Sequence, residues 1–206
     1  MAQPAPKSDY QGKLHHLQKD MIGRYYDSLT ASAEGRGNKA VYMLVSGNPV
    51  ELIQAFDMVP VYPEVNALQL AVKKQSLSHI LAAEEMGYST DNCAYVKADV
   101  GMYFAGRKTP FATIPEPDLI LCNYVGCNVY LQWFEHLAEF SHRPIYNLDI
   151  PFNRYTKTDE PSEDDVNYVV KQLEELIEIC ERMTGKSLDY KKLQRITELS
   201  GETGHL

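Results

Sequence analysis

Residues 40–46 read AVYMLVS, a continuous apolar run that stops at Gly47. Runs of this kind are typical of strands that are buried on both faces of a parallel sheet. Three shorter runs repeat the pattern, over residues 59–62, 118–122 (DLILC) and 144–148 (PIYNL). Together the four runs predict four strands of one parallel sheet.

Helical patterns lie between and around these runs. Leu14, Leu17 and Met21 recur at helical spacing, so residues 13–30 are predicted to form an amphipathic helix. Asn48 is predicted to cap a helix that begins at Pro49. Further helices are predicted over residues 67–86 with a break near Ser76, over a short segment that carries Cys93, and over residues 128–140, 165–184 and 188–200.

The alternation of strands and helices predicts an α/β fold, a Rossmann-like or flavodoxin-like parallel sheet with flanking helices. We predict a disordered arm over residues 1–12, the α/β domain over residues 13–155 and a helical segment over residues 156–206. The last two helices have apolar faces, yet no strand follows them. We therefore expect them to lead into a second domain that is absent from this chain, or to pack against a partner.

Composition excludes several classes of protein. The chain has 206 residues and a net charge of −8, which argues against a nucleic-acid partner. No window reaches the roughly 18 apolar residues of a membrane span, and the first residues lack the apolar core of a secretory signal. We expect a cytoplasmic protein without a membrane partner. In that reducing compartment the four cysteines are not expected to form disulfides.

Polar residues follow the predicted strands. In open parallel sheets, ligands bind beyond the carboxyl ends of the strands. Asn48, Glu64, Asn66 and Tyr124 lie in such positions and are candidates for a substrate pocket. Glu64 is also the candidate catalytic carboxylate, although a solvated turn residue is an equally good interpretation.

The cysteines fall into two groups. Cys127 lies in the loop beyond the third strand, and Cys93 lies at a predicted helix start, where the helix dipole favours a thiolate. Thiolates suit zinc or an iron–sulfur cluster, although a buried thiol remains an open interpretation for each. Cys122 ends an apolar strand and Cys180 lies on the apolar face of a late helix, so both are predicted to be core residues.

Several motifs, in their order and spacing, point to one family. They are GNPVEL at residues 47–52, CAYVKADVGM at residues 93–102, and a segment from DLI at 118–120 through Cys127 to WFE at 133–135. This arrangement resembles the 2-hydroxyacyl-CoA dehydratase and benzoyl-CoA reductase family over residues 13–205. The segment YVKADVGM resembles the benzoyl-CoA reductase branch, its B subunit in particular, more than the dehydratases.

The resemblance implies a [4Fe–4S] cluster that is held by three cysteines per subunit, two in the first half and one in the second. Cys93 and Cys127 match the first two ligands, whereas Cys122 and Cys180 fall outside the motif. The third cysteine ligand has no counterpart here, and we expect the chain to end before that second half begins.

The resemblance also implies a reaction, a very low-potential electron transfer to an acyl-CoA thioester that turns the ring of benzoyl-CoA into a cyclic diene. A homologous cluster-bearing subunit and an ATP-hydrolysing activator with its own cluster would be partners, with ferredoxin as the indirect electron donor. The chain has no G-x-x-x-x-G-K-[ST] motif, which agrees with ATP binding elsewhere. The alternatives are a 2-hydroxyacyl-CoA dehydratase subunit, a double-cubane-cluster reductase of small molecules, and an assembly subunit that mainly binds a homologous partner.

Overall fold

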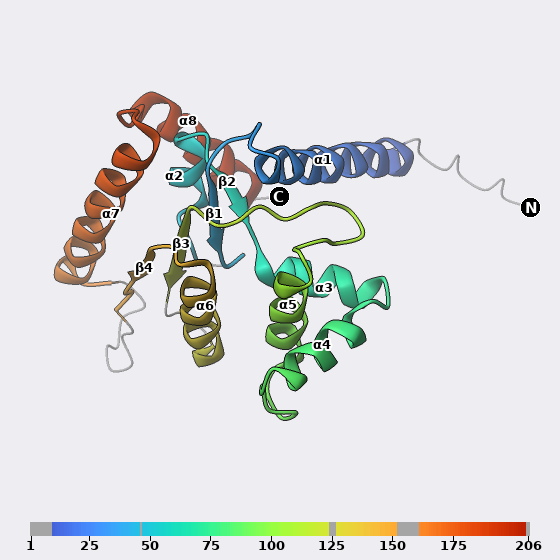
Figure 1. Ribbon diagram of the computed structural model, residues 1–206. Helices are drawn as coiled ribbons and strands as arrows, with labels where there is room; N and C mark the ends of the chain where they lie inside the picture. The colour runs from blue at the N-terminus through green and yellow to red at the C-terminus, as the bar shows by residue number, and fades with distance from the viewer. Residues whose placement is uncertain (1–9, 46, 124–126, 152–160, 205–206) are drawn as a thin grey trace, which may run out of the picture.

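The computed structural model of the protein describes residues 10–45, 47–123, 127–151 and 161–204, and these contain one four-stranded sheet (Figure 1). Each pair of neighbouring strands is parallel, which confirms the predicted α/β fold. Each of the four apolar runs supplies one strand. The strands are β1 (Ala40–Met43), β2 (Val59–Val61), β3 (Leu119–Asn123) and β4 (Ile145–Leu148).

The strand order is β2-β1-β3-β4, the order of the first four strands of a flavodoxin-like sheet. Helix α2 (Val50–Ala55) connects β1 to β2, and α6 (Asn128–Ser141) connects β3 to β4. The two helices cover opposite faces of the sheet, because α2 packs in one apolar core and α6 in the other. The boundary between β1 and β3 is therefore the topological switch point, where such sheets bind ligands.

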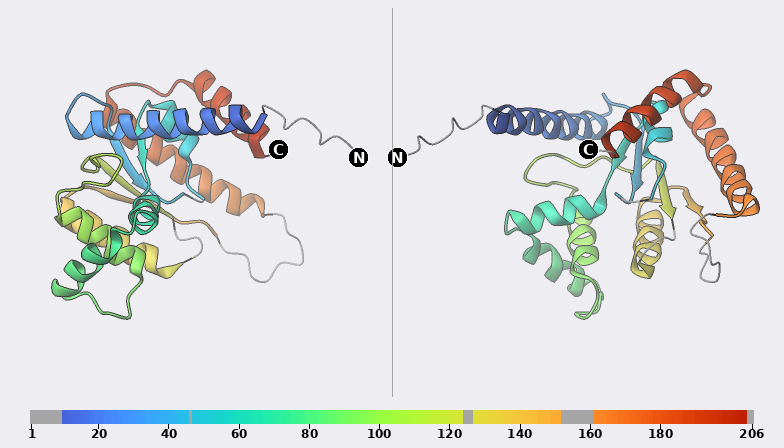
Figure 2. Two further views of the ribbon diagram at one scale, coloured as in Figure 1. Left: turned by 90° about the vertical axis from the view of Figure 1, so that its right-hand side faces the viewer. Right: turned by 180° about the vertical axis from the view of Figure 1, so that it is seen from behind.

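Of the remaining helices, α3, α4 and α5 pack mainly against one another, and α1 extends beyond the rest of the molecule (Figure 2). Helix α1 begins at Tyr10, within the predicted arm of residues 1–12, and residues 1–9 of that arm lie outside the described part. Within the described ranges, no helix combines the length and the apolar character that a membrane crossing requires. The bounds are α1 (Tyr10–Ala33), α3 (Pro63–Val72), α4 (Ser76–Glu85), α5 (Ala94–Phe104), α7 (Glu163–Thr184) and α8 (Tyr190–Gly204).

Each face of the sheet has its own apolar core. Tyr42 and Ile120 pack with residues of α1, α5 and α6, while Val41, Met43 and Leu121 pack with residues of α2 and α7. Every residue of β1 and β3 is buried. Burial on both faces explains why these strands are continuous apolar runs rather than alternating ones.

Two helix starts differ from their predictions. Helix α3 begins at Pro63 rather than at residue 67, because proline is well suited to the first helical position. Asn48 does not cap α2, since the capping position is taken by Pro49 and the Asn48 Nδ2 group donates to the carbonyl oxygen of Leu44 at 3.2 Å. The break predicted near Ser76 is confirmed, because α3 ends before that residue and α4 begins at it.

The last two helices pack differently from the expectation. Leu176 and Cys180 of α7 are buried in the core that also holds Val41 and Leu121, and α8 contacts α2. The apolar face of α7 thus covers this chain's own sheet, and that of α8 packs on α2. The domain limits at residues 155 and 156 stay a prediction and lie outside the described residues.

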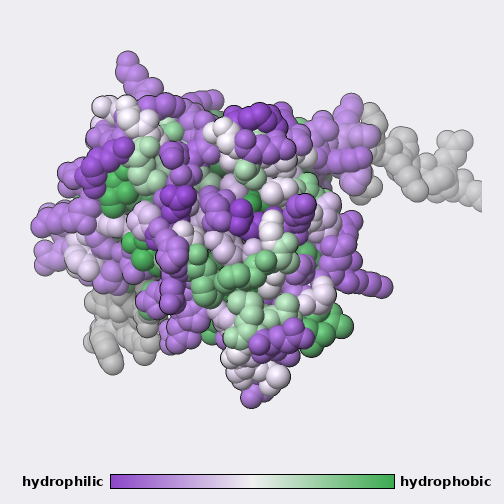
Figure 3. All heavy atoms as spheres, viewed as in Figure 1, coloured by the Kyte–Doolittle hydropathy of each residue, from purple (hydrophilic) through white to green (hydrophobic). Residues whose placement is uncertain are grey.

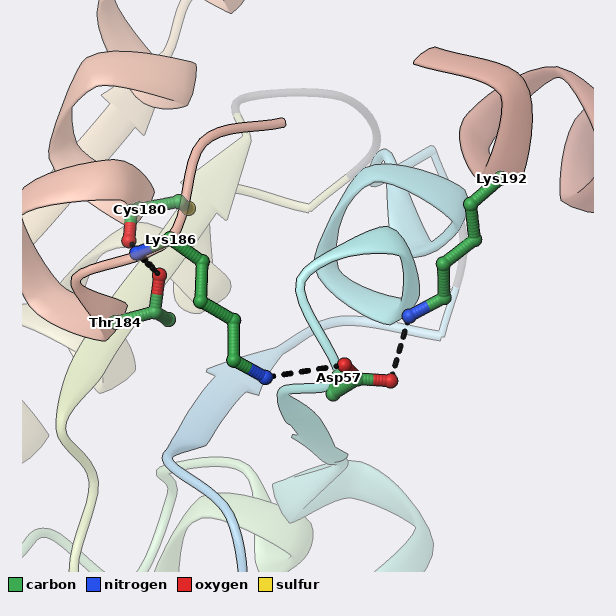
Figure 4. A network of polar contacts seen from close by, with 5 residues as sticks. All are labelled: Asp57, Cys180, Thr184, Lys186 and Lys192. Carbon is green, nitrogen blue, oxygen red and sulfur yellow. Dashed lines mark hydrogen bonds and ion pairs between the residues drawn. The ribbon is translucent and has the colours of Figure 1, made fainter. Parts of the chain in front are cut away.

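Asp57 joins the α7–α8 connection to the first half of the fold. Its carboxylate oxygens lie 3.2 Å from Nζ of Lys186 and 2.5 Å from Nζ of Lys192 (Figure 4). Hydrogen bonds from Lys192 and Lys186 lower the pKa of the Asp57 carboxyl. All three side chains are at least a third exposed, so such pairs contribute little stability each. The burial of Leu176 is therefore the stronger attachment of α7.

Leu176→Ala is expected to lower the free energy of unfolding by about 2–5 kcal/mol, because it leaves a cavity at a fully buried position. Val166→Ala on the same helix is the matched control, since Val166 is exposed. Urea unfolding followed by circular dichroism measures both variants. Equal midpoints for the two variants would show that α7 does not belong to this core.

Candidate functional site

Two cysteines stand at the N-termini of two helices. Cys93 is the capping residue of α5 and Cys127 is the capping residue of α6, and each has a non-helical backbone conformation. Neither thiol makes a side-chain capping hydrogen bond, and both cysteines are exposed. Cys93 precedes its helix rather than lying within it, and the Asn92 side chain accepts from the Cys93 backbone N–H at 2.7 Å.

Both cysteines line one cavity of about 320 Å³, so the structure brings the two predicted ligands together. Cys127 lies just past β3, whereas Cys93 comes from the connection between β2 and β3. Most of the other lining residues are apolar or aromatic. The cavity is lined by Glu64, Cys93, Tyr95, Val96, Cys127, Val129, Tyr130 and Trp133.

Glu64 is held at this cavity by a tyrosine. It lies in the first turn of α3, and the Tyr130 hydroxyl donates to its Oε1 at 3.0 Å. Burial, followed by the Glu64 hydrogen bond and charge, raises the pKa of Tyr130 to about 12, so this phenol stays a donor at neutral pH. The interpretation of Glu64 as a solvated turn residue is therefore wrong, because it is helical and half-buried. Its catalytic role stays a prediction.

The side of the cavity away from solvent is formed by Trp133, which is 1% exposed. Its Nε1–H donates to Oδ2 of Asp99 at 3.0 Å, and Asp99 is equally buried. Burial raises the pKa of the Asp99 carboxyl to about 7, and the Trp133 hydrogen bond opposes this only in part. A carboxyl group buried in an apolar core is unfavourable unless its oxygen atoms accept hydrogen bonds.

A second buried charge fixes the segment before Cys93. Lys97 is 3% exposed, and its Nζ donates to Glu84 Oε1 at 2.6 Å and to the carbonyl oxygen of Thr90 at 2.7 Å. These contacts connect α5, α4 and the loop that ends at Cys93. Lys97 therefore positions the first cysteine through the backbone of that loop.

Asn48 and Asn66, two other predicted site residues, do not line this cavity. Asn48 is half-buried beside β1, and Tyr124 lies outside the described residues. Asn66 is 1% exposed, and neither polar atom of its side chain has a hydrogen-bond partner within the described residues. The assignment of these three residues to a substrate pocket stays a prediction.

Cys122 and Cys180 are buried in the two cores of the sheet. Burial raises the pKa of each thiol to about 11, which keeps it protonated at neutral pH. Neither residue lines the cavity, so Cys93 and Cys127 are the two cysteines that do.

Two exposed thiols at helix N-termini fit part of an iron–sulfur site. Helix N-termini favour thiolates, and thiolates are the usual cluster ligands. Within the described ranges, no group of three or more His, Cys, Asp or Glu side chains is arranged to hold a metal ion. The two cysteines are therefore candidates for two ligands of such a cluster.

A cavity of about 400 Å³ lies at the opposite, amino edge of the sheet. It is lined by several charged residues, among them Lys39, Asp57, Asp118 and Lys186. Lys39 pairs with Asp118, and Lys186 pairs with Asp57. These ion pairs link segments of the fold, so this cavity is a weaker candidate for chemistry than the one that holds the cysteines.

Lys97 and Asp99 were not predicted as site residues. A signal for them exists in the sequence, because both are charged residues inside the otherwise apolar helix AYVKADVGMYF. The pairing of Asp99 with Trp133, 34 positions away, has no local signal.

A family profile described as "2-hydroxyglutaryl-CoA dehydratase, D-component" matches residues 45–206. The chain belongs to this family. The match includes every strand from β2 onward, both cavity cysteines and the helices α7 and α8. It confirms the family that the motifs indicate.

Relatives of this family are named as components of acyl-CoA enzymes. The B subunit of benzoyl-CoA reductase from Thauera aromatica is 41% identical over 187 residues, which are 90% of this chain and 42% of the relative. The alpha subunit of (R)-2-hydroxyisocaproyl-CoA dehydratase from Clostridioides difficile is 34% identical over 183 residues, 89% of this chain and 43% of the relative. The chain thus spans less than half the length of these relatives.

Asp99→Asn is expected to flatten the dependence of stability on pH. The folded-state pKa of about 7 lies above the ordinary value of 3.8, so the folded protein binds this proton more tightly than the unfolded chain. The contribution of Asp99 is therefore fully present at low pH and is lost as pH rises from about 4 to about 7. In that window, wild type should lose up to about 1.4 kcal/mol per pH unit relative to Asp99→Asn.

Urea unfolding of both proteins across this pH range measures the difference. Parallel stability curves would contradict a raised pKa at Asp99. Asp91→Asn is a matched control, because Asp91 is exposed.

Proposed function

We propose that this chain is part of an iron–sulfur enzyme subunit that passes low-potential electrons to the thioester of benzoyl-CoA, with energy from ATP hydrolysis by a separate activator. The observation that carries the proposal is the meeting of Cys93, Cys127 and Glu64 at one cavity. It is supported by relatives that are named as benzoyl-CoA reductase and hydroxyacyl-CoA dehydratase subunits.

In this proposal, Cys93 and Cys127 are two ligands of a [4Fe–4S] cluster. Such a cluster, when bound, supplies one-electron chemistry at low potential. The third cysteine ligand is proposed to lie in the part of the relatives that this chain does not span. Lys97 keeps Cys93 in place through the loop before α5.

Glu64 is proposed to exchange a proton with the substrate. The Tyr130 hydroxyl donates to Glu64 Oε1, and this hydrogen bond orients the carboxylate toward the cavity it lines. Tyr95, Val129 and Trp133 supply apolar and aromatic wall around it. A wall of this kind excludes water, which a strongly reduced intermediate requires.

A partner subunit is proposed to cover part of the surface. Exposed aliphatic side chains lie one turn apart on two adjacent helices, Leu68 and Val72 on α3 and Leu77 and Leu81 on α4. Apolar surface is visible over this region (Figure 3). Contiguous exposed apolar surface of this kind marks interaction sites. A homologous cluster-bearing subunit is the proposed occupant, and an activator that receives electrons from ferredoxin is the proposed electron source.

A second candidate function is that of a 2-hydroxyacyl-CoA dehydratase subunit. The relatives from Clostridioides difficile and Clostridium sporogenes, at 34% and 31% identity, are both named as dehydratase alpha subunits. The same cysteines and the same acidic residue would serve either reaction. Benzoyl-CoA and a 2-hydroxyacyl-CoA, supplied separately to the assembled enzyme with reduced activator, distinguish the two.

Cys93→Ser and Cys127→Ser are each expected to lower the iron and sulfide content of the anaerobically purified, partner-assembled protein by more than about tenfold. Cys122→Ala and Cys180→Ala are the controls, because both residues are buried away from the cavity and should leave the content unchanged. Full iron content in the Cys127→Ser protein would remove that residue from the proposed ligand set.

Glu64→Gln is expected to lower turnover by about 10²–10⁴-fold while the iron content stays at the wild-type level, because an amide accepts the Tyr130 hydrogen bond but cannot transfer the proton. Single-turnover kinetics with the assembled enzyme measure the loss. Unchanged turnover would leave Glu64 as a wall of the cavity only. Glu85→Gln is a matched control on the exposed end of α4.

A further inference from the structure

A line of contacts runs from the inside of the fold to the cavity. Asp99 Oδ2 accepts from Trp133 Nε1 at 3.0 Å. The Trp133 ring stacks on Tyr130, with ring centroids 6.2 Å apart and planes inclined by 25°. The Tyr130 hydroxyl then donates to Glu64 at 3.0 Å. Four residues from three helices thus form a continuous chain of contacts.

The first contact, between Asp99 and Trp133, is the most buried of the three. Asp99 and Trp133 are each 1% exposed and lie among Val96, Val100 and Phe134. A carboxyl group in such surroundings is unfavourable for folding, whereas an aliphatic residue would fill the space without that cost. An aliphatic residue, however, could not accept the hydrogen bond from the indole N–H.

The indole N–H is the group that defines the orientation of Trp133. The torsion about the last side-chain bond of tryptophan is intrinsically broad, so a hydrogen bond to the indole adds to packing in fixing the ring. A single acceptor on α5 selects one orientation. In the selected orientation the ring stacks on Tyr130 and lines the cavity.

We propose that Asp99 is a positioning residue of the cysteine cavity. Its carboxyl oxygen fixes the Trp133 indole, and the fixed indole in turn holds Tyr130, and through it Glu64, beside Cys93 and Cys127. The biological meaning of this arrangement rests on the proposed function. The arrangement itself is a property of the chain, so it is tested without cluster, substrate or partner.

Two substitutions separate the acceptor from the charge. Asp99→Asn keeps an acceptor oxygen of nearly the same position and removes the ionisable group. Asp99→Leu removes both and keeps the volume. Trp133 is the only tryptophan of the chain, so its fluorescence reports on this contact directly.

The experiment uses the full chain with reduced thiols. It records the Trp133 emission spectrum and the rates at which iodoacetamide alkylates each cysteine, resolved by mass spectrometry. Cys122 and Cys180 are internal controls for folding, because both are buried and should stay unreactive.

Asp99→Asn is expected to keep the wild-type emission maximum and the wild-type alkylation rates of Cys93 and Cys127. Asp99→Leu is expected to shift the emission maximum and to change those two rates by about two- to tenfold, the range that one net hydrogen bond produces. If Asp99→Leu matches wild type in both readouts, or if Asp99→Asn behaves as Asp99→Leu, the positioning role is overturned.

Trp133→Phe decides the case in which Asp99→Leu does not fold, which reactive Cys122 and Cys180 would reveal. Phenylalanine keeps a ring but lacks the N–H donor, so the alkylation rates of Cys93 and Cys127 should change by about two- to tenfold while Cys122 and Cys180 stay unreactive. Wild-type rates in Trp133→Phe would overturn the proposal.

These outcomes are independent of the proposed function. A protein that binds no iron could still show the Asp99–Trp133 dependence, and an iron-binding protein could lack it. Iron content and acyl-CoA turnover test the function, whereas emission and thiol reactivity test the positioning.

Discussion

The parallel pairing of β1 with β3 is the constraint on which the rest of the structure depends. Val41 lies opposite Leu119 and Met43 opposite Leu121, at the centre of a sheet that grows outward on both sides. Because the chain extends the sheet in both directions from this pair, α2 and α6 cover opposite faces. The candidate site follows from this topology, since Cys127 comes just after β3 and Glu64 just after β2.

Helix α5 is the element in which stability and site geometry meet. Its first turn carries Cys93 at the cap, and its buried face carries Lys97 and Asp99 among apolar residues. Each of the two charged side chains is unfavourable in a core and is offset by a specific partner, Glu84 and the Thr90 carbonyl for Lys97, and the indole of Trp133 for Asp99. Trp133 itself lines the cavity, and Thr90 lies in the loop that ends at Cys93, so two of these partners are tied to the shape of the site.

The contrast between the two pairs of cysteines has a simple physical cause. Cys122 of β3 and Cys180 of α7 are buried in the two cores, and burial raises their pKa values, so both thiols stay protonated and apolar at neutral pH. Cys93 and Cys127 lie where helices begin, with their sulfur atoms outside the helical hydrogen-bond pattern. The same residue type is therefore structural in one place and a candidate ligand in another.

The sequence by itself determined the four strands, most helices and the separation of core cysteines from candidate ligands, because these depend on local patterns of apolar residues, caps and proline. The family followed from the order and spacing of motifs. Tertiary structure alone decided that Glu64 and the two cysteines share a cavity, that Asp99 accepts from Trp133, and that α7 covers this sheet instead of another surface. The periodicity of an amphipathic helix shows that one face must be buried but does not show against which surface, since it is the same for any apolar surface. The contact between Asp99 and Trp133, 34 positions apart, is set by how their helices pack.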